Sequence, residues 1–377
     1  MNYTETLSWI HGTERFGSRL GLGRMGRLLH RMGDPHLKVP YIHVAGTNGK
    51  GSTTTMIASA LTAGGFKTGK FISPFILEFR ERMQIDSEMV PEETLAALAT
   101  RLRPIAEEFK AAGDPPTEFE LVTVLGLTWF AEAGCDIAVL EVGLGGRLDA
   151  TNIILPPLVA VITRIDYDHT AILGDTLAAI AGEKCGILKR GSTVICYPDQ
   201  EEEALAVIRR RAKEEDDPLI LPDRTALSVL SADLTGSRIV YRGQEIFIPL
   251  PGPHQVLNTI TAVEALNALS SSRFALPPSA IAAGIAAARF PARLELLRQS
   301  PPVLVDGAHN PNGGRALCEA LKALDLHDLT AVVGMLRDKD CLPVLRMMAP
   351  YCARMIITTV PNPRSCPAEE FAELARG

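Results

Sequence analysis

The sequence lacks a long hydrophobic run, a leader-like N-terminus and a pair of closely spaced cysteines. No apolar stretch reaches the roughly 18–20 residues that a membrane span requires, so no membrane partner is expected. Residues 1–6 contain no basic segment followed by an apolar one, and we therefore expect the chain to remain in the cytoplasm, where it is made. The seven cysteines are odd in number and form no C-x-x-C pair, which indicates free thiols in a reducing compartment.

The sequence also lacks an excess of positive charge. With a formal net charge of −6, the chain has no general attraction to nucleic acid or to an anionic membrane. Its one dense basic cluster, residues 208–213, is followed at once by the acidic residues 214–217, a pattern typical of a solvated helix face. No repeat or low-complexity segment is present, and 377 residues, of which 46% are hydrophobic, predict two globular domains.

A glycine-rich stretch at residues 41–53 is the most informative part of the sequence. An apolar run at residues 41–45 predicts a strand, and a helix-competent segment continues through residue 61. In a strand–loop–helix of this kind, loop N–H groups and the helix N-terminus converge on phosphate oxygens. Lys50 can reach the terminal phosphates, and a hydroxyl of Ser52 or Thr53 can face a magnesium ion. The predicted nucleotide-binding residues of this loop are Gly46, Thr47, Asn48, Gly49, Lys50, Gly51 and Ser52.

The loop departs from the usual phosphate-loop pattern, G-x-x-x-x-G-K-[ST]. Val44 stands in place of the first glycine, and Gly51 follows the lysine instead of serine or threonine. On this stretch alone, an ordinary glycine-rich turn between a strand and a helix remains an alternative.

The rest of the first 289 residues alternates buried strands with helices. Continuous apolar runs at residues 137–143 and 158–163 are typical of strands buried on both faces of a parallel sheet. We therefore predict a doubly wound, mostly parallel α/β domain with ligands at the carboxyl ends of its strands. Residues 75–83 are interpreted as an irregular, mobile loop, and Pro104 is expected to kink or split a helix at residues 91–110.

Two further regions complete the predicted architecture. Short alternating runs in residues 219–250 indicate a small antiparallel addition to the first domain, which we place at residues 1–289. Residues 290–377 then show a second strand–helix alternation, which predicts a smaller Rossmann-like α/β domain.

Several polar residues at predicted strand ends are candidates for chemistry. Glu141 can hold a magnesium ion or position a nucleophile, or it can simply pair with Arg147. Lys184 can cap a helix or pair with Glu183, and His169 taken alone is more often structural. Residues 306–311 form a tight polar turn, and most such turns are only turns.

Taken together, these motifs identify a resemblance to a known family. The sequence resembles the folylpolyglutamate synthase and dihydrofolate synthase family of the Mur ligase superfamily. The matching segments cover nearly the whole chain in order: residues 43–52, 139–152, 168–169, 183–189, 254–258, 291–295, 306–311 and 338–340.

This resemblance implies an ATP-dependent ligase that adds L-glutamate to a folate, to dihydropteroate or to both through an acyl phosphate. It implies a monomer, two Mg²⁺ sites and a carbamylated Lys184. The implied catalytic residues are Lys50, Lys184 and His169, and the implied metal ligands are Ser73, Glu141 and His169. Beyond the loop, the implied ATP contacts are Asn258, Arg293, Asp306 and His309, the last three from across the domain junction. The implied substrate-binding residues are Ser73, Arg82, Thr117, Phe119, Asp149 and Ala150.

Two departures from the family pattern stand out. Phe75 occupies the position after Ser-Pro where the family usually has histidine. The sequence stops at Gly377, where the family continues for another helix and strand, so the second domain is interpreted as either short or truncated. The alternatives are another Mur-superfamily acid–amino-acid ligase, a P-loop NTPase without ligase activity, and an inactive binding protein.

Overall fold

The computed structural model describes residues 1–13, 21–337, 339–362 and 364–376. The chain forms two compact units. The first unit contains Met1–Thr225 and Asn258–Ala288, and the second contains Ala226–Leu257 and Arg289–Gly377. The predicted domains differ from these units in the segment Ala226–Leu257, and the predicted boundary at residues 289 and 290 stays a prediction.

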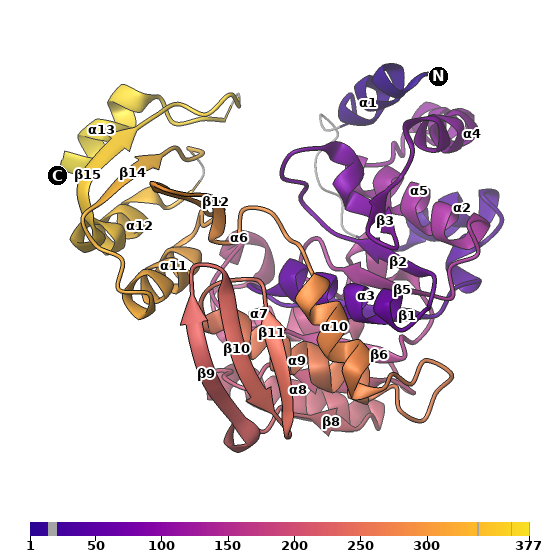
Figure 1. The fold of residues 1–377 in the computed structure, drawn as a ribbon. Helices are drawn as coiled ribbons and strands as arrows, with labels where there is room; N and C mark the ends of the chain where they lie inside the picture. Colours follow the sequence, from indigo (N-terminus) through magenta and orange to yellow (C-terminus); the bar gives the residue numbers. More distant parts are fainter. Residues whose placement is uncertain (14–20, 338, 363, 377) are drawn as a thin grey trace. The chain divides into compact units, whose positions relative to one another are not determined.

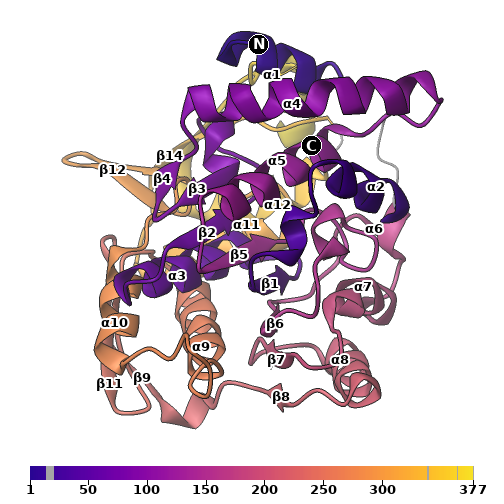
Figure 2. The same ribbon diagram turned by 90° about the vertical axis from the view of Figure 1, so that its right-hand side faces the viewer.

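The first unit is built on an eight-stranded sheet with the order β4-β3-β2-β5-β1-β6-β7-β8. Strand β1 (Tyr41–Ala45) lies between β5 (Ile137–Glu141) and β6 (Val159–Ile162), and both pairings are parallel. The other parallel strands are β2 (Thr68–Phe71), β7 (Thr193–Cys196) and β8 (Leu219–Ile220). Figure 2 shows β1, β6, β7 and β8 following one another across the sheet. The predicted doubly wound, mostly parallel sheet is confirmed.

Helices pack against the sheet, as expected for strands that are buried on both faces. The helices are α1 (Tyr3–His11), α2 (Gly23–Arg31), α3 (Lys50–Ala63), α4 (Glu92–Ala111), α5 (Glu118–Glu132), α6 (Thr170–Leu173), α7 (Leu177–Lys184), α8 (Glu202–Glu215), α9 (Pro253–Asn267) and α10 (Pro278–Ala287). Successive side chains of β1 point to opposite faces of the sheet, so Tyr41 and Ala45, which are four residues apart, lie on the same face. Two separate cores share this face. Tyr41 belongs to the core formed with α5, and Ala45 to the core formed with α7 and α8.

Residues 75–89 are more regular than the sequence predicts. A 3₁₀ turn, η3 (Phe79–Arg82), leads into β3 (Met83–Ile85), which pairs with β2 and with β4 (Glu88–Met89) in antiparallel fashion. The carboxylate of Glu81 accepts the backbone N–H groups of residues 76, 77 and 78, each at 2.8 Å. Because the charged residues of this segment organise its backbone, the prediction of an irregular loop at residues 75–83 was wrong for residues 79–83.

Pro104 does not split the helix in which it lies, because α4 runs unbroken from Glu92 to Ala111. A proline in a helix removes one backbone hydrogen bond. The helix nevertheless buries an apolar stripe that includes Leu98, Leu102 and Ile105, and this burial holds the turns on both sides of the proline against the core. Within the described ranges, none of the helices combines the length and the apolar character that a membrane span requires.

The second unit combines small antiparallel and parallel sheets with helices. Strands β9 (Leu227–Asp233), β10 (Gly236–Tyr241) and β11 (Gln244–Ile248) form the predicted antiparallel sheet and lie side by side in Figure 1. The hairpin β12 (Glu295–Gln299) and β13 (Pro302–Val305) precedes α11 (Pro311–Ala323). Strands β14 (Leu329–Val333) and β15 (Cys352–Ile357) pair in parallel, with α12 (Cys341–Met348) between them in sequence and α13 (Ala368–Arg376) after them. A separate, smaller C-terminal α/β domain was predicted and is present.

Candidate active site

The loop between β1 and α3 adopts a backbone that only glycine fits at two positions. Gly46 has φ +153° and Gly49 has φ +85°, both in the region that favours glycine. A Cβ atom on Gly46 would lie 1.8 Å from Thr163 Oγ1, and one on Gly49 would lie 2.4 Å from Asn258 Oδ1. The two glycines therefore allow close approach of neighbouring groups. The second contact places Asn258, a predicted ATP-binding residue on α9, directly against the loop.

Some backbone N–H groups of this loop already donate hydrogen bonds within the protein. The backbone N–H groups of Thr47 and Asn48 both donate to the carbonyl oxygen of Arg164, at 2.8 and 3.2 Å. The first backbone bond of α3 runs from Thr53 N to Gly49 O. The N–H groups at the start of a helix have no acceptor within the helix. The part of the predicted site best suited to hold phosphate is therefore the start of α3, at Lys50, Gly51 and Ser52.

Two lysines converge on the carbonyl oxygen of Gly46. Lys50 Nζ donates to Gly46 O and to Thr47 O, each at 3.2 Å, and Lys184 Nζ donates to Gly46 O at 2.7 Å. Lys184 is buried at the end of α7, and burial together with the nearby Lys50 charge lowers its pKa to about 7. Glu183 pairs instead with Arg147 at 2.9 Å, so the alternative in which Lys184 pairs with Glu183 was wrong.

Glu141 and Ser73 meet at the carboxyl ends of β5 and β2. Glu141 lies beside Val44 of β1 and is buried, and its Oε2 atom accepts the backbone N–H of Ser73 at 3.2 Å. Arg147, the alternative partner of Glu141, pairs with Glu183 as described above. The sheet therefore brings two of the three predicted metal ligands together beside the phosphate loop.

The third predicted metal ligand, His169, lies on the loop after β6. It precedes α6 with φ +50°, and its half-exposed side chain has Nε2 3.8 Å from Asp168 Oδ1. In the part of the chain that the structure describes, no three histidine, cysteine or acidic side chains form a metal-binding group. Metal binding by Ser73, Glu141 and His169 therefore stays a prediction.

A cavity of about 290 Å³ in the first unit gathers all the predicted substrate-binding residues. Ser73, Arg82, Thr117, Phe119, Asp149 and Ala150 all line it, although they come from three separate stretches of the sequence. The cavity also has lining residues that the sequence did not predict: Gly21, Pro74, Glu120, Gly143, Leu144 and Leu148. Phe75 is not among the lining residues but contacts one of them, since the Arg82 guanidinium lies 5.3 Å from the centre of its ring.

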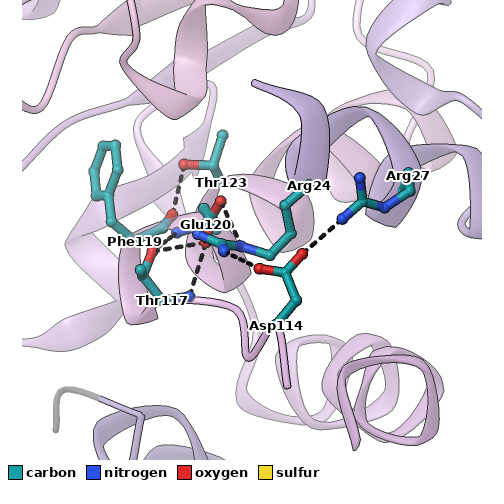
Figure 3. Close-up of polar contacts among 7 residues, drawn as sticks. All are labelled: Arg24, Arg27, Asp114, Thr117, Phe119, Glu120 and Thr123. Carbon is teal, nitrogen blue, oxygen red and sulfur yellow. Dashed lines mark hydrogen bonds and ion pairs between the residues drawn. The ribbon is translucent and has the colours of Figure 1, made fainter. Parts of the chain in front are cut away.

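One wall of this cavity is supported by an ion-pair network that sequence reasoning missed, and only its Arg24–Glu120 pair is buried (Figure 3). Arg24 of α2 contacts Glu120 of α5 at 2.8 Å and Asp114 at 2.6 Å, and Arg27 reaches the other oxygen of Asp114. Glu120 also accepts the backbone N–H of Thr117, which closes a capping box at the start of α5. Glu120 lies with Glu118 in the acidic first turn of α5, and its partner Arg24 lies 96 residues away, so the local sequence carries no signal of this pair.

The remaining predicted ATP contacts lie together in the second unit. The carboxylate of Asp306 accepts the backbone N–H groups of Leu294 and Ala308, each at 2.8 Å, and burial raises the pKa of Asp306. Arg293 lies 4.8 Å from the centre of the Phe290 ring, and the exposed His309 places Nδ1 2.8 Å from Gly307 O. Asp338, in the last family motif, lies outside the described residues.

We expect Gly49→Ala to weaken nucleotide binding by at least about tenfold, a free-energy change of about 1.4 kcal/mol. The new methyl group would displace Asn258 from the loop as well as strain the backbone. Calorimetric titration with ATP measures the change. Gly65→Ala is the matched control, because Gly65 has φ +89° and no atom within 4 Å of an added Cβ. Equal losses of affinity in both variants would contradict a role for the loop–Asn258 contact.

Comparison with known proteins agrees with this arrangement. Residues 44–266 match the Mur ligase middle domain, and residues 292–377 match the Mur ligase glutamate ligase domain. Folylpolyglutamate synthase of Lacticaseibacillus casei is 37% identical over 391 residues, which cover 100% of this chain and 90% of the relative. Dihydrofolate synthase/folylpolyglutamate synthase of Bacillus subtilis is 36% identical and covers 98% of this chain and 88% of the relative.

One of the similar solved structures contains bound ligands. An FPGS–AMPPCP–folate complex is 35% identical, with a TM-score of 0.86 over 96% of this chain and 90% of that chain. On the evidence of both domain matches, the two relatives and this structure, the chain belongs to the folylpolyglutamate synthase and dihydrofolate synthase family of Mur ligases.

Proposed function

We propose that this chain is an ATP-dependent ligase that joins the amino group of L-glutamate to a carboxylate of folate. The observation that carries the proposal is the cavity lined by Ser73 and Asp149 beside the phosphate loop. Ser73 lines that cavity and also donates its backbone N–H to Glu141, which neighbours β1 just before the loop begins. A carboxylic acid in the cavity and a triphosphate on the loop would thus share one edge of the sheet.

The chemistry we propose proceeds through an acyl phosphate. A carboxylate oxygen of the acceptor attacks the γ-phosphorus, and the bond between that phosphorus and the bridging oxygen of ADP breaks. The glutamate nitrogen then attacks the acyl carbon, the amine loses a proton, and the bond from carbon to phosphate oxygen breaks. Lys50 and the N-terminus of α3 would neutralise charge on the transferring phosphoryl group.

The residues at the sheet edge fit a magnesium ion. Glu141 and Ser73 offer oxygen donors, the type that Mg²⁺ prefers, and Mg²⁺ commonly needs only one or two protein carboxylates besides phosphate and water. We propose that Ser73, Glu141 and His169 are the protein ligands of the magnesium ions at the two predicted sites. When bound, the ion supplies positive charge that offsets the charge of the phosphates.

We also propose that Lys184 is carbamylated. A lysine reacts with carbon dioxide only as the neutral amine, and the lowered pKa of about 7 makes this form abundant near neutrality. The ammonium first loses one proton, and the neutral nitrogen then bonds to the carbon of CO₂ and releases a second proton, so a cation becomes an anion. In that form Lys184 would help to hold a metal ion rather than repel it.

The cavity also suits a second acceptor. Folate and dihydropteroate share a pterin and an aminobenzoyl group, so the same cavity would serve both, and we propose dihydropteroate as a second acceptor. Arg293, Asp306 and His309 stay proposed ATP contacts. The monomeric state and the cytoplasmic location expected from the sequence stay predictions.

A phosphate-release assay tests the proposal. With ATP and Mg²⁺, we expect turnover only when glutamate and either tetrahydrofolate or dihydropteroate are both present. An acceptor labelled with ¹⁸O in its carboxylate should pass one label to the released phosphate, as an acyl phosphate requires. Slow hydrolysis indifferent to acceptor and glutamate would instead indicate an NTPase. Turnover with a different acid or amino acid would indicate another Mur-type ligase.

A further inference from the structure

A buried histidine in the central strand connects to the wall of the cavity. His43 lies in the middle of β1 and is completely buried, and it is absent from the mechanism described above. Its Nε2 atom lies 2.8 Å from Thr151 Oγ1, which in turn is hydrogen-bonded to the carboxylate of Asp149. Asp149 lines the cavity. The three side chains therefore form one chain of contacts from β1 to the cavity.

The surrounding hydrogen bonds determine where the protons lie. Asp149 Oδ2 accepts the N–H of Leu144 at 2.9 Å, and Oδ1 accepts the N–H of Thr151 at 3.0 Å. Burial raises the pKa of Asp149, but hydrogen bonds from the Thr151 hydroxyl and from the backbone of Leu144, Thr151 and Gly143 act against this rise and favour the ionised form. An ionised carboxylate can only accept, so in this form the Thr151 hydroxyl donates to it. The threonine has only one proton, so it must accept from His43, which is therefore protonated on Nε2.

The surroundings of the other ring nitrogen of His43, Nδ1, are consistent with a proton on Nε2. Nδ1 is buried and has no hydrogen-bond partner among the described residues. An orphaned buried N–H group is rarer than an under-used acceptor, so an unprotonated Nδ1 is the less costly arrangement. Burial and the charge of Lys189 also lower the pKa of His43 to about 3, which keeps the ring neutral.

We propose that His43 is a positioning residue for the acceptor site. By donating from Nε2 to Thr151, it commits the threonine proton to Asp149 and holds that carboxylate in one orientation. Asp149 in turn joins the two segments of cavity wall at residues 143–144 and 149–150. The role rests on the proposed function, since it assumes that the cavity takes the folate or pteroate acceptor.

Paired substitutions at His43 and Thr151 test this role by separating the hydrogen bond from side-chain volume. His43→Gln keeps an N–H donor at a similar reach, and His43→Leu removes it. We expect His43→Leu to raise both the KM and the Kd for the acceptor by about tenfold, with the KM for ATP changed less than twofold. His43→Gln should stay within about twofold of the wild type. Thr151→Val removes the hydroxyl and Thr151→Ser keeps it, so we expect the first to weaken acceptor binding as His43→Leu does and the second to bind like the wild type. This second pair keeps the test decisive if a His43 variant fails to fold.

A spectroscopic measurement checks the proton assignment directly. In ¹⁵N-labelled wild-type protein without substrate, His43 should show a protonated Nε2 and an unprotonated Nδ1. The opposite tautomer would overturn the proposal, and so would equal effects of His43→Leu and His43→Gln on acceptor binding. If the wild-type chain binds neither tetrahydrofolate nor dihydropteroate in calorimetry, the proposed function fails, and the positioning role fails with it. Normal acceptor binding with unaltered variants overturns the positioning role alone.

Discussion

Replacing Lys184 with alanine should lower kcat for glutamate addition by about 100- to 1,000-fold, the usual cost of losing one group aimed at developing charge. The lysine is buried and contacts the phosphate loop through Gly46 O. Its loss would remove both that contact and the proposed carbamate. If the carbamate is the active form, short carboxylic acids such as formate or acetate should partly restore kcat, since they can place a carboxylate in the space left by the side chain.

The control for this experiment is Lys189→Ala. Lys189 is a partly buried lysine with a pKa lowered to about 8 by burial, but its Nζ donates to Asn152 O and Ile154 O rather than to the loop. Short acids should not rescue that variant. Unchanged kinetics in Lys184→Ala would remove the catalytic role, and a loss that no acid repairs would favour a role of the unmodified amine.

The pH dependence of this effect follows from the pKa of Lys184. In the folded protein its pKa is about 7, below the ordinary lysine value of 10.5, so the ammonium predominates only below about pH 7. Carbamylation needs the neutral amine, so added bicarbonate should increase activity above pH 7 and lose its effect as the pH falls through 7. Initial rates with and without bicarbonate between pH 6 and 8.5 measure this. A constant response across that range would contradict carbamylation.

Replacing Arg24 with methionine should destabilise the first unit by about 3–5 kcal/mol, as expected when one partner of a buried ion pair is removed. Arg24 and Glu120 are only 8% and 3% exposed, so the carboxylate left behind could not be fully rehydrated. Both tryptophans, Trp9 and Trp129, lie in the first unit and pack on the same core, so their fluorescence during guanidinium unfolding reports on this unit.

Arg101→Met is the matched control for this measurement. Arg101 contacts Glu132 at 2.8 Å, a distance similar to that of the buried pair, but both side chains are about half exposed. Exposed ion pairs contribute at most about 1 kcal/mol, so the control should unfold close to the wild type. Similar unfolding free energies for the two variants would show that the Arg24–Glu120 contact does not support the cavity wall.

Local patterns and family motifs predicted the parts of this protein that depend on neighbouring residues. The strand, loop and helix around Lys50 follow from a short run of sequence, and the strand-end rule correctly placed Ser73 beside Glu141. The cavity-lining residues came from the family resemblance, which carries spatial information that composition and periodicity do not.

Features that depend on distant partners could not be predicted in the same way. The contact of Arg24 with Glu120 joins helices 96 residues apart, and nothing within either helix specifies it. The bonds from Thr47 and Asn48 to Arg164 likewise depend on the β1–β6 pairing. Strand β12 has only two adjacent apolar residues, Leu296 and Leu297, rather than an alternating pattern or a longer apolar run, so the sequence does not predict its pairing with β13.

The tie between the phosphate loop and Arg164 has a mechanical consequence. Thr47 is held both by Arg164 O and by Asp166, whose backbone N–H and C=O each bond to its hydroxyl at 3.0 Å. His169 follows only three residues later on the same stretch of backbone. If the loop shifts when a triphosphate binds, the backbone that carries His169 should therefore shift with it. Triphosphate binding on the loop and ligand binding at His169 would then be coupled without any rearrangement of the core.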